Sequence, residues 1–227
     1  MKKSIAILAC AMTVLTGCAT LNNLAKGSLI GGVGGGAVGA GVGAAIGGDK
    51  GAAIGAAIGT AVGAGAGAII GNVMDKKAEE LAALEAAQVE TVEDANGLKA
   101  IKVTFDSGIL FATNKSNLSA EAKSNLKKFA DEMKDLSDTD ITIYGHTDNT
   151  GSAEVNERLS LQRANAVSAE LQADGIAKSR ITTEGKSFTM PVADNSTAEG
   201  RAQNRRVEVF ISANQNMIAA AENGELK

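Results

Sequence analysis

The chain has 227 residues, a formal net charge of −4 at pH 7, one histidine and two cysteines. The negative charge argues against nucleic acid as a partner, and a single histidine excludes a multi-histidine zinc site. Because few groups remain for catalysis, we expect that the protein is not an enzyme and that it binds neither a metal nor a cofactor.

Residues 1–17 have the pattern of a secretory signal peptide. Two lysines precede an apolar run from Ile5 to Leu15, which is short for a transmembrane helix, and small residues follow. Cys10 would leave with the signal and Cys18 would begin the mature chain, so no thiol pair remains for a disulfide.

The end of this signal, Leu15-Thr16-Gly17-Cys18, resembles the lipobox of bacterial lipoproteins. The resemblance implies acylation of Cys18, and acyl chains contribute about 0.8 kcal/mol per buried methylene to membrane binding. In such lipoproteins aspartate after the cysteine implies inner-membrane retention, so Ala19 favours the outer membrane. We predict a lipidated N-terminus and linker over residues 18–28; an ordinary signal with an incidental cysteine is the alternative.

Residues 29–74 are rich in glycine, alanine, isoleucine and valine, and glycine recurs every four residues. The repeated glycines are Gly31, Gly35, Gly39, Gly43, Gly47, Gly51, Gly55, Gly59, Gly63, Gly67 and Gly71. This spacing aligns them along one ridge of a helix, where a second backbone can approach closely. The segment resembles the glycine-zipper domains of bacterial envelope proteins. We expect a helical hairpin that turns at residues 47–51 and is either membrane-inserted or self-associated in a homo-oligomer.

Residues 75–88 are charged and rich in alanine, which predicts a spacer helix. We expect the folded domain to occupy residues 89–213 and a tail to occupy residues 214–227. The domain should open with a β-hairpin that turns at Asn96-Gly97, since this dipeptide is the strongest short hairpin signal.

Beyond the hairpin, segments with the hydrophobic period of a strand alternate with segments that have the period of a helix. Strands are predicted at residues 101–105, 141–145, 181–183 and 207–211, and helices at residues 119–136 and 154–173. Ser119 is the expected N-cap of the first helix, and Asp174-Gly175 should end the second. The pattern predicts an α+β fold in which two helices cover one face of a mixed sheet.

Arg163 lies near the middle of the apolar sector of the second helix. That sector also contains Val155, Leu159, Ala166 and Val167. A desolvated guanidinium is unfavourable unless it meets an anion, and the available anion is Asp148, just beyond a predicted strand. Two interpretations follow: Asp148 and Arg163 pair with each other and pin a loop to the helix, or they divide a zwitterionic ligand between them.

The segments GHTDNTGSAEVNERLSLQRANAV (residues 145–167) and TAEGRAQNRRVEV (residues 197–209) resemble the OmpA-like peptidoglycan-binding domain family. The resemblance covers roughly residues 98–212 and implies the βαβαβ-type mixed sheet of that family. With the lipobox and the glycine repeat in front, the whole chain resembles YiaD-type outer-membrane lipoproteins.

In that family, the aspartate and arginine at the positions of Asp148 and Arg163 hold meso-diaminopimelate of the peptidoglycan stem peptide. The resemblance therefore implies that Asp148 binds the ammonium group of the ligand and that Arg163 binds its carboxylate. The other predicted ligand-binding residues are Thr147, Asn156, Arg205, Thr113 and Asn114. One position departs from the family, because Ala112 follows Phe111 where many relatives have aspartate.

Two residues next to these in the sequence, Arg206 and His146, have other predicted roles. Arg206 either helps to build the wall of the site or is a surface charge. His146 is expected to pack or to form a hydrogen bond at the strand end, without a catalytic role.

Together these expectations describe a lipid-anchored outer-membrane protein. Its periplasmic domain binds peptidoglycan non-covalently and tethers the outer membrane to the cell wall. In a second interpretation the glycine-rich hairpin is the functional part, a membrane-assembly or pore-like element, and the C-terminal domain is only an anchor.

Overall fold

The structure is a computed structural model that describes residues 64–84, 87–112 and 115–226. The expected signal peptide, Cys18 and most of the glycine-rich hairpin lie outside these residues. Thr113 and Asn114 also lie outside them. What the sequence predicts for these segments therefore stays a prediction.

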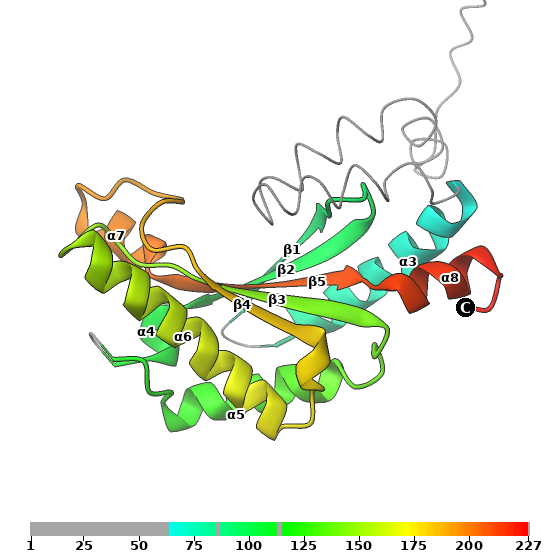
Figure 1. The fold of residues 1–227 in the computed structure, drawn as a ribbon, viewed down its shortest axis with the longest axis horizontal. Helices are drawn as coiled ribbons and strands as arrows, with labels where there is room; N and C mark the ends of the chain where they lie inside the picture. The colour runs from blue at the N-terminus through cyan, green and yellow to red at the C-terminus, as the bar shows by residue number, and fades with distance from the viewer. Residues whose placement is uncertain (1–63, 85–86, 113–114, 227) are drawn as a thin grey trace, which may run out of the picture.

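A five-stranded mixed sheet forms the centre of the fold (Figure 1). The strands lie in the order β1-β2-β5-β3-β4; β3 and β4 are parallel, and the other neighbours are antiparallel. Their bounds are β1 Gln88–Glu93, β2 Lys99–Asp106, β3 Thr139–Gly145, β4 Ile181–Gly185 and β5 Arg206–Ala213. The predicted α+β class with a mixed sheet is confirmed.

The hairpin between β1 and β2 turns at Asn96-Gly97, as predicted. A carboxylate oxygen of Asp94 accepts hydrogen bonds from the backbone N–H groups of Asn96 and Leu98 at 2.8 and 2.9 Å. Gly97 has a φ of 71°, a left-handed conformation that favours glycine. The local sequence therefore determines this turn and, with it, the register of β1 on β2.

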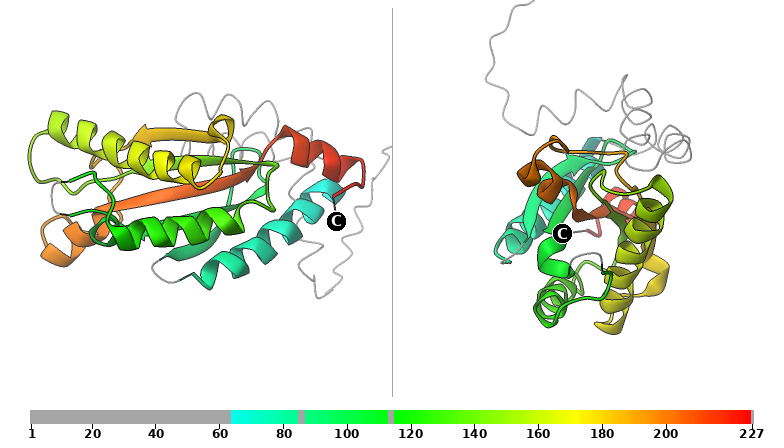
Figure 2. Two further views of the ribbon diagram at one scale, coloured as in Figure 1. Left: turned by 90° about the horizontal axis from the view of Figure 1, so that it is seen from below. Right: turned by 90° about the vertical axis from the view of Figure 1, so that its left-hand side faces the viewer.

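Three long helices pack on one face of the sheet (Figure 2). They are α3 Ala64–Ala82, α5 Ala120–Glu132 and α6 Ala153–Ala173. The short helices are α4 Ser107–Leu110, α7 Ala198–Asn204 and α8 Gln215–Glu222, with a 3₁₀ turn at Lys178–Arg180. The two predicted helices are α5 and α6.

Local sequence sets the ends of these two helices. The Oγ of Ser119 accepts a hydrogen bond from the N–H of Ala122 at 2.9 Å and caps α5. Helix α5 ends at Glu132 rather than at residue 136. Beyond α6, Gly175 has a φ of 105°, so the predicted stop after this helix is present.

The core lies between the sheet and the helices. Alternate residues of the neighbouring strands β2 and β5 are at most 1% exposed: Ile101, Val103, Phe105, Val207, Val209 and Ile211. Phe105 packs edge-to-face on Phe129 of α5, with ring centroids 6.1 Å apart. Each large apolar side chain that is fully buried contributes about 1.5–3 kcal/mol relative to an exposed one.

Helix α3 is continuous across residues 74 and 75, where the sequence suggests the end of the hairpin and the start of a spacer. Ile70, Met74 and Leu81 are fully buried and belong to the same core as the sheet. The Nζ of Lys77 donates to the carbonyl oxygen of Glu132 at 3.0 Å, a favourable place for a cation at the end of α5. The folded unit therefore begins earlier than residue 89.

The predicted tail contains helix α8, which packs on α3. Asn214 caps α8 by accepting hydrogen bonds from the N–H groups of residues 216 and 217, and Met217 and Ile218 are buried. None of the helices in the described part of the chain has the length and apolar character that crossing a membrane requires.

Candidate functional site

The loop between β3 and α6 carries the central residues of the predicted site. Asp148 Oδ1 accepts a hydrogen bond from the N–H of Thr150 at 2.8 Å. The Nδ2 of Asn156, in the first turn of α6, donates to the carbonyl oxygen of Thr150 at 2.9 Å. Asn156 thus stabilises the loop that positions Asp148.

Two glycines let α6 lie close to the sheet. Gly145 and Gly185 are register partners at the ends of β3 and β4. A Cβ at Gly145 would lie 2.0 Å from the carbonyl oxygen of Ser160, and a Cβ at Gly185 would lie 2.6 Å from the Oγ of Ser160. Because Arg163 follows Ser160 within one turn, these two glycines set its position over the sheet.

A groove of about 390 Å³ opens beside this loop. It is lined by five of the seven predicted ligand-binding residues: Thr147, Asp148, Asn156, Arg163 and Arg205. The other two lie outside the described residues. The structure therefore gathers around one groove every predicted residue that it describes.

Asp148 pairs with Arg205. Arg205 Nη1 donates to Asp148 Oδ2 at 2.7 Å, and no ion pair joins Asp148 to Arg163. The first interpretation, a direct pair between Asp148 and Arg163, is therefore wrong. Burial raises the pKa of Asp148, but hydrogen bonds from Arg205 and Thr150 outweigh it and lower the pKa below its ordinary value, so the carboxylate is ionised at neutral pH.

Arg163 is 3% exposed and has no carboxylate partner among the described residues. Its Nε donates to the carbonyl oxygen of Lys115 at 3.2 Å, and its guanidinium carbon lies 5.3 Å from the centroid of the Phe111 ring. Burial and the nearby Arg205 lower the pKa of Arg163, while Asp148 opposes this shift. The guanidinium is thus held at Nε and by Phe111, and the described residues supply no further acceptor.

The buried face of α6 is more polar than predicted. It carries Asn156, Ser160, Arg163, Val167 and Leu171, at spacings of four and three residues. The prediction that Val155 shares this face is wrong, since its side chain is 46% exposed. The spacing of the apolar residues alone predicted a buried face that is rotated toward the solvent-exposed side of α6.

Among the groove-lining residues that were not predicted to contact a ligand, three bear on its chemistry: Ser107, Phe111 and Arg201. Arg201 lies within the second motif segment and donates to the carbonyl oxygen of Asn195 at 2.9 Å. Ser107 begins α4, a short helix for which the sequence shows only a turn signal, Asp106-Ser107-Gly108.

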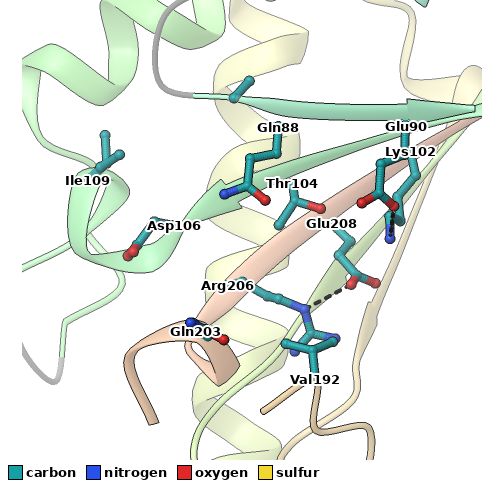
Figure 3. Close-up of a pocket in the computed structure, with 11 residues that line it drawn as sticks. Gln88, Glu90, Lys102, Thr104, Asp106, Ile109, Val192, Gln203, Arg206 and Glu208 are labelled. Atoms are coloured by element: carbon teal, nitrogen blue, oxygen red, sulfur yellow. Dashed lines mark hydrogen bonds and ion pairs between the residues drawn. The ribbon is translucent and has the colours of Figure 1, made fainter. Parts of the chain in front are cut away.

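Arg206 does not line the groove; it alternates along β5 with the core residue Val207, so it lies on the opposite face of the sheet from the helices (Figure 3). Its Nε donates to Glu208 Oε1 at 2.8 Å. His146 packs edge-to-face on Tyr144, and its Nε2 lies 3.2 Å from Glu208 Oε2. Burial raises the pKa of Glu208, but the neighbouring His146 and Arg206 outweigh it and lower the pKa to about 2.

A hollow of about 600 Å³ lies on this opposite face. Its two basic side chains already have partners: Arg206 pairs with Glu208, and Lys102 lies 2.6 Å from Glu90 (Figure 3). An anionic ligand would compete with a carboxylate for either side chain, whereas Arg163 in the groove has no carboxylate partner among the described residues. The groove at Asp148 is therefore the better candidate site.

Comparison with known protein families identifies the families that this chain resembles. Residues 110–205 match the OmpA family, and residues 1–76 match the YMGG-like Gly-zipper family. The C-terminal part of the chain is an OmpA family domain. The resemblances to the OmpA-like family and to glycine-zipper domains are confirmed.

Relatives of the OmpA family domain occur in several bacteria. Outer membrane protein Omp38 of Acinetobacter baumannii is 41% identical over 111 residues, which cover 48% of this chain and 31% of Omp38. Probable lipoprotein YiaD of Escherichia coli is 38% identical over 112 residues, which cover 49% of this chain and 51% of YiaD. Peptidoglycan-binding protein ArfA of Mycobacterium tuberculosis is 41% identical over 113 residues, which cover 50% of this chain and 35% of ArfA. The match thus spans about a third to a half of each relative.

Among solved structures, the cell wall anchor of the T6SS from Pseudomonas aeruginosa is similar to this OmpA family domain. The TM-score is 0.52 and the sequence identity 30%, over 62% of this chain and 96% of the other. The similarity in sequence and in structure therefore extends over nearly the whole of that solved chain.

Proposed function

We propose that the OmpA family domain of this chain binds peptidoglycan non-covalently, through the diaminopimelate of the stem peptide. An acylated Cys18 anchors the chain in the outer membrane, with the domain in the periplasm, and the chain tethers the two layers. The names of ArfA, a peptidoglycan-binding protein, and of Omp38, an outer membrane protein, support this proposal.

The observation that carries the proposal is the buried Arg163, which has no carboxylate partner in the described part of the chain and lies in the same groove as the ionised Asp148. The free end of diaminopimelate carries an ammonium and a carboxylate on one carbon atom. A planar guanidinium takes a carboxylate through two parallel hydrogen bonds. The ligand would supply the anion that Arg163 lacks, and Asp148 would accept from the ammonium.

The other charges of the groove suit the same ligand. Arg163, Arg201 and Arg205 line the groove together with the single carboxylate of Asp148. This positive excess favours a stem peptide in which carboxylates outnumber ammonium groups. Asp148 can serve both Arg205 and the ligand, because a carboxylate has about four acceptor positions.

We expect Asp148→Asn to reduce binding to purified diaminopimelate-type peptidoglycan at least about tenfold, since the ammonium loses its counter-charge. Asparagine keeps an acceptor for the N–H of Thr150, so the loop should stay in place. Co-sedimentation measures this, with the full chain in detergent because α3 contributes to the core. Asp140→Asn, an exposed position on β3, is the matched control. Equal sedimentation of Asp148→Asn and wild type would refute the proposed site.

Lipid anchoring has a separate test. We expect Cys18→Ser to accumulate as an unprocessed precursor of higher mass, because serine offers no thiol for acylation. Cys10→Ser, in the expected signal peptide, should be processed normally. Mass spectrometry of the outer-membrane fraction distinguishes these results. A Cys18→Ser protein of mature mass in that fraction would contradict the anchor.

A further inference from the structure

Ser107 has a buried hydroxyl without a partner. Its residue is 2% exposed, it lines the groove at Asp148, and its Oγ has no hydrogen-bond partner among the residues that the structure describes. The hydroxyl of Thr147, in the same groove, is also buried and without a partner. Buried polar groups nearly always have partners, because losing water without a new hydrogen bond is unfavourable. Ser107 and Thr147 are thus two residues of one groove whose hydroxyls have no acceptor among the described residues.

The main chain of Ser107 is fixed by two residues that line the same groove. Its N–H donates to the carbonyl oxygen of Arg205 at 3.0 Å, and its carbonyl oxygen accepts from the N–H of Phe111 at 2.8 Å. Arg205 binds Asp148, and Phe111 lies against Arg163. Ser107 is thus tied to the residues that support both charged groups of the site.

We infer that Ser107 is a further ligand-binding residue, whose hydroxyl donates a hydrogen bond to a carboxylate or carbonyl oxygen of the bound stem peptide. The inference rests on the proposed function. An oxygen acceptor fits best, because the arginines of the groove favour electron-rich ligand atoms. Because its Oγ is not in contact with solvent in this structure, the side chain must turn about its single torsion to reach the ligand, and the main chain need not move.

The inference predicts that Ser107→Ala weakens binding and does not destabilise the fold. Affinity for a tripeptide of L-alanine, D-glutamate and meso-diaminopimelate should fall about tenfold, since one hydrogen bond to a charged group is lost. The melting temperature should stay equal or rise, because alanine removes a buried hydroxyl that has no partner in the free protein. Calorimetry with the full chain in detergent, together with melting curves, measures both quantities.

Ser168→Ala is the matched control. Ser168 is a buried serine of α6 outside the groove, and its Oγ accepts from Gln172 Nε2 at 2.9 Å. This variant should lower the melting temperature slightly and leave the affinity unchanged. The inference is overturned if Ser107→Ala binds like wild type, or if its lower affinity comes with a lower melting temperature. If wild type itself does not bind the tripeptide, the proposed function fails instead.

Discussion

Arg163→Lys is expected to weaken binding of a meso-diaminopimelate stem peptide almost as strongly as Arg163→Ala, by roughly 30-fold to several-thousand-fold. Lysine keeps the charge but has no planar fork for the ligand carboxylate. The single ammonium of lysine also cannot replace both the Nε of Arg163, which donates to the Lys115 carbonyl oxygen, and the terminal nitrogens that would bind the ligand. Calorimetric titration of both variants with the peptide measures the loss.

The same arginine should discriminate between wall types. A stem peptide with lysine in place of diaminopimelate lacks the carboxylate, so Arg163 would stay without an anion and affinity should fall steeply. Arg158→Lys, at an exposed position of the same helix, should keep wild-type affinity and preference. Equal affinity of the wild type for the two peptides would rule out carboxylate recognition by Arg163.

Stability gives an independent check on the role of Arg163. Since Asp148 pairs with Arg205, no ion pair among the described residues is lost when Arg163 is replaced. Arg163→Met keeps much of the apolar volume and removes a buried charge. Its melting temperature should therefore equal or exceed that of wild type, while binding is lost.

The parts of the fold that follow from the sequence are those in which neighbouring residues decide the structure. Asn96-Gly97 makes its turn with the carboxylate of Asp94, and Ser119 caps its helix through the N–H three residues later. Gly175 ends α6 because it adopts a positive φ. In each case both partners lie within a few residues, so a short segment contains the whole interaction.

The packing of α3 and α8 could not be predicted in the same way. The buried face of α3 carries Ile70, Met74 and Leu81, and its partners include Met217 and Ile218, far along the chain. A glycine repeat that continues into α3 favours pairing with another helix of its own kind. Only the three-dimensional structure shows that the end of this repeat packs on the folded domain.

The candidate site was predictable where a residue conflicts with its surroundings. Arg163 on a core-facing helix is such a conflict, and the need for an anion leads to Asp148. Ser107 gives no such signal, since a hydroxyl without a partner can be recognised only once its surroundings are known.

Gly145→Ala is expected to destabilise the domain by about 3 kcal/mol or more, which lowers the melting temperature by roughly 10 °C. The new Cβ would lie 2.0 Å from the carbonyl oxygen of Ser160, and a backbone atom cannot rotate away. Helix α6 must therefore move off the sheet. Because Arg163 moves with α6, peptide affinity should fall as well.

Gly71→Ala is the control for the Gly145→Ala variant. Gly71 lies inside α3, where a Cβ would meet nothing within 4 Å, so alanine should raise stability by about 1 kcal/mol through its helix propensity. Thermal unfolding of the two variants should thus shift in opposite directions. If Gly145→Ala melts like wild type, α6 does not need this close approach, and the glycine does not set the position of Arg163.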